Sequence, residues 1–309
     1  MDVLSDAVTA MRTGRPHSNR TRRAGGWAMR FRPVSAAGFH VVLEGSCWLL
    51  PKDHEPVRLG AGDVVCLLPQ VIDYAVADDP DTPLAEVPVS SLSEALAGPP
   101  SAAGGPVGAT VMLCGAYLLD ERRPHPLLAE LPRFIHLPAR VGSRTELRAA
   151  VDLLGSELDR PGQGSDVIVP ALLDMLLLYI LRAWYSEQVA QGVPIGWAGA
   201  LADAPVSAAL RAIHRDPARQ WTVERLGAEG GLSRAAFARR FSALVGRPPL
   251  AYLTWWRMTL AARMLRESDA PLHAVATRTG YASEFAFAKA FKREFGTAPG
   301  GYRKATERR

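Results

Sequence analysis

Residues 230–249 read GGLSRAAFARRFSALVGRPP, and residues 280–299 read GYASEFAFAKAFKREFGTAP. The two stretches match at an offset of fifty residues, with Gly230, Ser233, Phe237, Phe241, Gly246 and Pro249 recurring as Gly280, Ser283, Phe287, Phe291, Gly296 and Pro299. Each copy predicts a short helix, a glycine turn, a serine N-cap and a second helix with aromatic residues four apart. This is the pattern of a helix-turn-helix unit, and two units rich in Arg and Lys favour DNA binding.

The aromatic stripes predict which face of each second helix is left for DNA, because successive residues lie about 100° apart. We expect a buried stripe of Phe237, Phe241 and Leu244 in the first unit and of Phe287, Phe291 and Phe295 in the second. The residues expected to face DNA are Arg234, Ala235, Ala238, Arg239 and Ser242, then Glu284, Phe285, Lys289, Lys292 and Arg293. For Phe285 two readings stay open, a place in the core or contact with a thymine methyl group.

A strong helical pattern over residues 250–266 joins the two units. Its length of about 25 Å is of the order needed to hold two helices in successive major grooves. Along it, Arg257 and Arg263 are candidates for phosphate contacts, or simply for a solvated face.

Charge is distributed unevenly along this chain of 309 residues and net charge +5. Residues 199–309 hold 19 basic and 9 acidic residues, a net charge of +10, and the remainder carries −5. The basic part has the electrostatic character of a polyanion binder. Three cysteines without a CxxC pair and an N-terminus without an apolar signal segment predict a cytoplasmic protein.

The N-terminal part of the chain has a different pattern of apolar and polar residues. Short apolar runs between residues 26 and 68, and again at 110–119, predict strands of a small β-barrel or sandwich. Residues 78–108, rich in Asp, Pro, Ser and Gly, predict a long surface loop. Residues 143–158 and 167–186 predict two helices, the second with a broad apolar face that needs a partner helix. Its apolar run of about 13 residues is too short to span a membrane.

The C-terminal third resembles the DNA-binding domain of the AraC/XylS family of bacterial transcription regulators. The resemblance covers residues 205–304 and rests on ATRTGYASE at 276–284, Phe287, Phe291, Lys292, FGTAP at 295–299, Tyr302 and Arg303. It implies two helix-turn-helix units that bind one double-stranded DNA site and recruit RNA polymerase.

Residues 1–138 resemble a cupin barrel, through GFHVVLEG at 38–45, LGAGDVVCLLP at 59–69, and the later CGAY at 114–117 and HPLL at 125–128. Enzymatic cupins bind a metal through several His residues and a carboxylate, but Tyr74 stands where a further His is expected. His40, Cys114 and His125 could still form a three-ligand site for Zn²⁺ or a similar ion, or be ordinary buried residues. A redox role for Cys114 would need a lowered thiol pKa and access to oxidant.

Together these patterns predict an α+β protein in three parts. Residues 1–138 form a cupin-like sensing barrel, 139–200 a helical dimerisation and linker segment, and 201–309 an all-α DNA-binding domain able to fold alone. We expect a homodimeric, non-enzymatic, non-membrane transcription regulator controlled by a small effector, a metal or an oxidant. The alternatives are a cupin-type metalloenzyme with a DNA-binding tail and an architectural DNA binder without a ligand. No GxSxG, P-loop or HExxH motif supports an enzyme.

Overall fold

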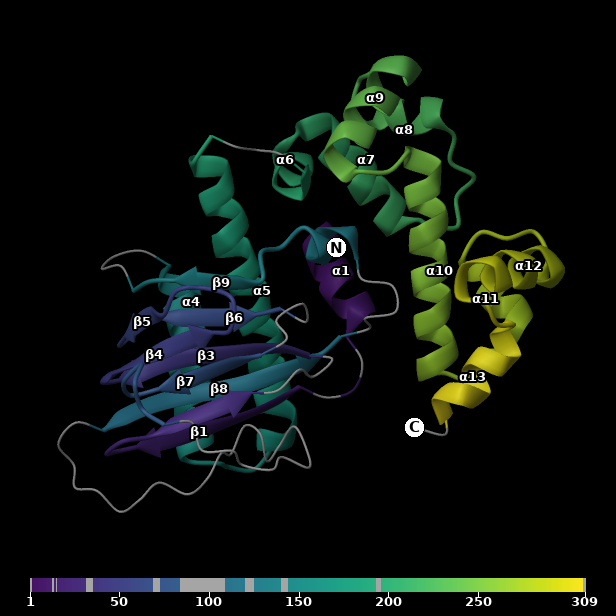
Figure 1. Ribbon diagram of the computed structural model, residues 1–309. Helices are drawn as coiled ribbons and strands as arrows, with labels where there is room; N and C mark the ends of the chain where they lie inside the picture. The colour runs from purple at the N-terminus through teal and green to yellow at the C-terminus, as the bar shows by residue number, and fades with distance from the viewer. Residues whose placement is uncertain are drawn as a thin grey trace. The chain divides into compact units, whose positions relative to one another are not determined.

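The computed structural model describes residues 2–12, 14, 16–31, 36–68, 73–83, 109–119, 125–139, 144–192 and 196–307. The chain forms two compact units (Figure 1). One comprises Arg12–Pro124 and Leu131–Glu187, and we call it the barrel unit. The other comprises Met1–Met11, His125–Glu130 and Gln188–Arg309, and we call it the helical unit.

The barrel unit contains two antiparallel sheets. The five-stranded sheet has the order β1-β8-β3-β6-β9, with β1 at His17–Arg23, β8 at Thr110–Leu118, β3 at Ala36–Glu44, β6 at Val64–Leu67 and β9 at Phe134–Leu137. The four-stranded sheet has the order β2-β7-β4-β5, with β2 at Ala28–Phe31, β7 at Tyr74–Ala77, β4 at Ser46–Pro51 and β5 at Val57–Gly60. The predicted cupin-like fold is therefore confirmed.

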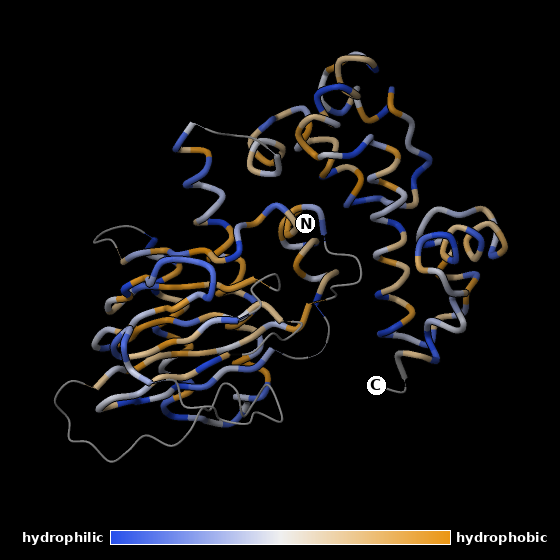
Figure 2. The backbone as a smooth tube through the Cα atoms, viewed as in Figure 1, coloured by the Kyte–Doolittle hydropathy of each residue, from blue (hydrophilic) through white to orange (hydrophobic). Residues whose placement is uncertain are grey.

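The core of the barrel unit lies between the two sheets. Every second residue of β8, namely Met112, Cys114 and Ala116, points into it beside residues of β2 and β4 such as Met29 and Leu49. This alternation follows from the two-residue period of a strand. Figure 2 shows how apolar residues run along these strands.

The other face of β8 is buried too, beneath helices α4 (Thr145–Asp159) and α5 (Ser165–Ala190). The Tyr117 hydroxyl donates a hydrogen bond of 2.5 Å to the carbonyl oxygen of Leu173 on α5. Gly115 lets β3 approach closely, because a Cβ atom there would lie 2.2 Å from the ring of Phe39. The strand that lines the core is thus also the strand on which α5 rests.

Helix α5 is longer than the apolar run that suggested it. It has 26 residues and is long and apolar enough to cross a membrane by length and composition, with 28% of its most apolar window buried. The length argument against a span is therefore wrong for this helix, because the apolar character continues past the run. Ile168 and Met175 on it are exposed.

The helical unit repeats one arrangement twice. Helices α8 (Val223–Glu229) and α9 (Arg234–Val245) form the first helix-turn-helix, and α11 (Leu272–Arg278) and α12 (Glu284–Phe295) form the second. Helix α10 (Pro249–Glu267) joins them, while α6 (Gly196–Ala202) and α7 (Ala204–Arg215) precede them and α13 (Pro299–Glu307) follows. Ser233 and Ser283 cap α9 and α12 through the amides of Ala236 and Ala286. Gly246 and Gly296 end these helices, both with φ +72°.

Two short elements from the front of the sequence belong to the helical unit. They are α1 (Val3–Met11) and α3 (Pro126–Ala129), which sequence reasoning assigns to the sensing domain. Helix α1 packs against α7 and α10, and His125, the N-cap of α3, contacts Tyr252 and Trp255 of α10, which local sequence patterns do not show. The predicted helices at 143–158 and 167–186 lie in the barrel unit, and residues 84–108 of the predicted loop lie outside the described residues.

Candidate nucleic-acid interface

Helix α9 buries one stripe and leaves the opposite face to solvent. Phe237 and Phe241 are fully buried, and Val245 completes the stripe where Leu244 was expected, so that Leu244 is only half-buried. Arg234, Ala235 and Arg239 are exposed, while Ala238 and Ser242 are half-buried. The predicted face of the first unit is therefore open to a partner.

Helix α12 repeats this division. Phe287 and Phe291 are fully buried, and Phe295 is half-buried and stacks on Phe291 with ring centroids 4.3 Å apart. The predicted DNA-facing side chains are exposed, namely Glu284, Phe285, Lys289, Lys292 and Arg293. Phe285 is 80% exposed, which removes the core reading for this residue. An aromatic side chain held in solvent on a cationic helix suits an apolar contact with a base.

The basic side chains of these helices differ in how they are paired. Arg234 lies 3.0 Å from Glu224 of α8, and Arg240 donates to Asp203, the N-cap of α7, over 2.7 Å. No ion pair joins Arg239, Lys289 or Lys292 to any other residue that the structure describes. Their charges are therefore available to a polyanion such as a DNA backbone.

Arg257 on α10 is a structural residue and not a phosphate contact. Its guanidinium donates to the carbonyl oxygens of Pro217 and Arg219, over 2.7 and 2.9 Å, and burial lowers its pKa. The same loop reaches the second turn, where the Gln220 amide donates to the carbonyl oxygen of Gly280 over 3.1 Å. The second candidate, Arg263, lies 2.8 Å from Glu267 on its own helix. The contacts of Arg257 and Gln220 hold the two helix-turn-helix units together. Sequence reasoning missed them because each joins a side chain to a backbone carbonyl oxygen that is distant in sequence.

In the barrel unit, His40 lies between the two polar groups that the sequence singled out. Its Nδ1 is 3.1 Å from Cys114 Sγ and its Nε2 is 3.0 Å from the Tyr74 hydroxyl. Burial lowers the pKa of His40 to about 4 and raises the pKa of Cys114 to about 12. The thiol is thus held protonated and is 0% exposed, which is the opposite of what an oxidant sensor needs.

The expected third metal ligand is engaged within the other unit. His125 belongs to the helical unit, where its Nδ1 accepts from the Leu127 amide and its Nε2 lies 3.3 Å from the Tyr252 hydroxyl. Both ring nitrogens are therefore occupied. Among the described residues, no group of three or more His, Cys, Asp or Glu side chains could hold a metal ion. The residues present do not fit a zinc site.

A two-sheet barrel followed by paired helix-turn-helix units with open cationic faces is the architecture of a DNA-binding regulator with a cupin-type front domain. Comparison with known families supports both halves. A model described as "Cupin" matches residues 2–186, and one described as "Helix-turn-helix domain" matches residues 226–305. The chain belongs to the family of AraC-like transcription regulators.

Relatives that match over nearly their whole length are also described as transcription regulators. A putative AraC-like transcription regulator of Streptomyces lividans is 37% identical over 98% of both chains. The transcriptional regulator AlkR of Acinetobacter baylyi is 30% identical over 98% of this chain and 99% of its own. Among solved structures, the DNA-binding domain of AdpA in complex with a target DNA is 35% identical, covering 34% of this chain and 95% of that one, with a TM-score of 0.33.

Proposed function

We propose that this regulator reads its operator with α9 and α12, placed in successive major grooves. The observation that carries the proposal is the shared division of the two helices into a buried Phe stripe and an exposed face. The reading residues would be Arg234, Ala235, Ala238, Arg239 and Ser242 on α9, and Glu284, Phe285, Lys289, Lys292 and Arg293 on α12. Base-reading side chains of such units usually lie in the first turns of the second helix, where Arg234, Glu284 and Phe285 stand.

The experiment that tests this function starts from a pool of random duplexes, from which the full chain selects its site. The affinity for the selected duplex should fall steeply with salt, because phosphate contacts release counterions. It should also exceed the affinity for a scrambled duplex at the same salt. A chain that selects no common sequence, or binds both duplexes equally, is not a sequence-specific regulator.

We further propose that an organic effector, and not a metal or an oxidant, acts through the barrel unit. A hollow of about 560 Å³ lies between α4 and the edge of the five-stranded sheet, and its lining includes Val64, Leu137, Val151 and Arg148. Its lining suits a ligand with an apolar body. Such a ligand changes DNA affinity only if it binds two arrangements of the protein unequally. A compound that raises the melting temperature of the full chain but leaves DNA affinity unchanged would count against this coupling.

We place the protein in the cytoplasm, as a non-enzymatic homodimer that recruits RNA polymerase at its promoters. The metalloenzyme alternative would need His40, Cys114 and His125 on one ion, and His125 is bonded elsewhere. An architectural binder without a ligand would show no change in DNA affinity with any effector. Measuring DNA affinity with compounds that raise the melting temperature therefore separates the effector-controlled regulator from the architectural binder.

A further inference from the structure

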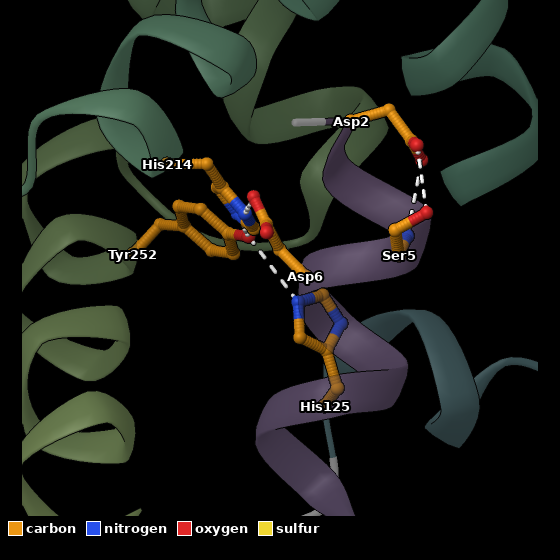
Figure 3. A network of polar contacts seen from close by, with 6 residues as sticks. All are labelled: Asp2, Ser5, Asp6, His125, His214 and Tyr252. Carbon is orange, nitrogen blue, oxygen red and sulfur yellow. Dashed lines mark hydrogen bonds and ion pairs between the residues drawn. The ribbon is translucent and has the colours of Figure 1, made fainter. Parts of the chain in front are cut away.

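The helical unit contains a buried chain of polar side chains that DNA reading does not use. It runs from Asp6 on α1 through His214 on α7 and Tyr252 on α10 to His125, which precedes α3 (Figure 3). The three distances are 3.2, 2.7 and 3.3 Å. All four side chains are buried, with Tyr252 and His125 at 0% exposure. Buried polar groups of this kind stabilise a structure only when each has its partner.

One arrangement of protons satisfies every member of the chain. The Leu127 amide can only donate, so His125 Nδ1 accepts and the proton of the neutral ring sits on Nε2. That Nε2–H donates to the Tyr252 oxygen, whose own proton then goes to His214 Nε2. The remaining proton of His214, on Nδ1, donates to the Asp6 carboxylate. Burial lowers the pKa of both histidines, which keeps them in this neutral form.

Aromatic packing closes the same site from the other sides. The His125 ring packs edge-on against Trp197 and Trp255, with ring centroids 5.0 and 4.9 Å apart. The His214 ring stacks on Trp256, with ring centroids 4.0 Å apart. Next to His125, the carboxylate of Glu130 accepts from the Trp197 amide at the start of α6, over 2.7 Å. The front segments α1 and His125–Glu130 are therefore built into the first half of the helical unit.

Tyr252 connects this chain to the first recognition helix. Its ring lies 5.9 Å from that of Phe241, the central residue of the buried stripe of α9. Tyr302 holds the same position in the second repeat, and its ring lies 5.4 Å from that of Phe291 on α12. The partners of the two hydroxyl groups differ. Tyr302 accepts from Arg266 of α10, over 3.0 Å, whereas Tyr252 bonds to His214 and to His125 from the front of the chain.

Among the residues that the structure describes, the buried apolar cluster of the second unit lies within residues 258–302 and includes Met258, Val275, Phe287 and Phe291. No residue from the front of the sequence belongs to this described cluster. In contrast, α1 and α3 are next in sequence to two strands of the barrel unit that pair with each other. The strand β1 follows α1, β8 precedes α3, and the two strands pair with His17 opposite Ala116. Strand β8 also lines the barrel core through Cys114 and Ala116.

From this asymmetry we propose that the Asp6–His214–Tyr252–His125 chain is a latch through which the barrel controls the first recognition helix alone. Helix α12 then acts as a DNA anchor whose position does not depend on the barrel. The inference deepens the proposed function and rests on it, since it assigns different roles to the two reading helices. Loosening the latch frees α1 and α9 together and leaves α12 as it was.

The test is hydrogen–deuterium exchange on the full chain without DNA, in two latch variants and one matched control. Tyr252→Phe removes only the hydroxyl that joins the two histidines, and Asp6→Ala removes the far end of the latch. Tyr252→Phe loses two buried hydrogen bonds and Asp6→Ala loses one. Each variant should therefore raise exchange in α1 and α9 by at least about tenfold and leave α12 unchanged. Tyr302→Phe, the same change in the second repeat, should raise exchange in α12 and not in α1 or α9.

The proposal is wrong if α9 keeps its protection in both latch variants, or if α12 loosens as much as α9 does. Footprinting on the selected duplex adds a functional readout, in which Asp6→Ala should weaken protection over one half of the site only. The exchange measurement contains no DNA. A chain that binds no DNA at all would overturn the proposed function, while the exchange pattern would still decide whether the latch exists.

Discussion

Arg239 and Lys289 stand at the same place in the two repeats but offer DNA different chemistry. Each lies six residues after its serine cap, is exposed, and points away from the Phe stripe of its helix. A guanidinium can bond two acceptors of a guanine in the major groove, whereas an ammonium is a point charge. The two residues should therefore contribute differently to sequence preference.

Arg239→Ala should weaken binding to the selected duplex and relax preference at one base pair by about 1–3 kcal/mol. Lys289→Ala should weaken binding more evenly across sequences and reduce the salt dependence. The charge-matched control is Arg240→Ala, because Arg240 is engaged with Asp203 of α7. Titrations at fixed salt against duplexes changed at single positions measure this, and equal base preference in Arg239→Ala and Arg240→Ala would refute the assigned face.

His40 makes the barrel sensitive to acid. Its pKa is lowered from 6.5 to about 4 by burial, so below pH 6.5 the unfolded chain binds a proton that the folded barrel does not. The free energy of unfolding should therefore fall as the pH drops, by about 2 kcal/mol between pH 7.5 and pH 5. Exchange of the β3 and β8 amides at the two pH values measures the barrel separately from His125 and His214.

The control for this effect is a pair of glutamine variants. His40→Gln should abolish most of the loss in barrel protection, whereas His54→Gln, at an exposed position, should keep it. If His40→Gln lost as much barrel protection at pH 5 as the parent chain does, protonation of another group would be the cause.

At the scale of elements, the sequence predicts best what is determined locally. The caps, glycine turns and Phe stripes of α9 and α12 follow from neighbours within one or two helical turns, and both helices begin directly after their predicted caps. The shift of the buried stripe from Leu244 to Val245 is a difference of one residue near a helix end. Arg257 shows the limit, since its partners Pro217 and Arg219 lie about forty positions away in sequence.

Helix α5 is the element whose surface calls for a partner. Ile168 and Met175 are exposed on it, and the half-buried Leu172 and Tyr179 continue their line at the spacing of a helix–helix contact. We expect a second copy of the chain to cover this stripe. The combined change Ile168→Glu and Met175→Glu should convert the dimer to a monomer in sedimentation experiments, because each carboxylate would be buried without a partner.

The matched control for α5 is Ser186→Glu, at an exposed polar position of the same helix. It adds a charge without touching the stripe and should leave the dimer intact. A parent chain that sediments as a monomer would show that this dimer does not form. A double variant that remains dimeric would place the dimer contact elsewhere.

At the scale of the whole molecule, the division into domains could be predicted only in part. The change of texture and charge near residue 200 coincides with the start of most of the helical unit. The contribution of α1 and of residues 125–130 could not be predicted, because Asp6 and His214 are 208 positions apart. The sequence repeat does show that Tyr252 and Tyr302 occupy matching positions. It does not show that their hydroxyl groups have different hydrogen-bond partners. The metal hypothesis failed for the same reason, since only the fold shows what His125 contacts.

The fragment of residues 201–309, which the sequence suggests as an independent domain, should therefore be stable only in its second half. It lacks Asp6, His125 and the fully buried Trp197, so the first unit loses both hydrogen-bond partners and apolar contacts. The second unit keeps its whole buried cluster. In the fragment, exchange should be fast in α9 and slow in α12, and salt-dependent DNA binding should persist but be weaker than that of the full chain. Equal protection of α9 in the fragment and in the full chain would show that the front segments contribute nothing to the first unit.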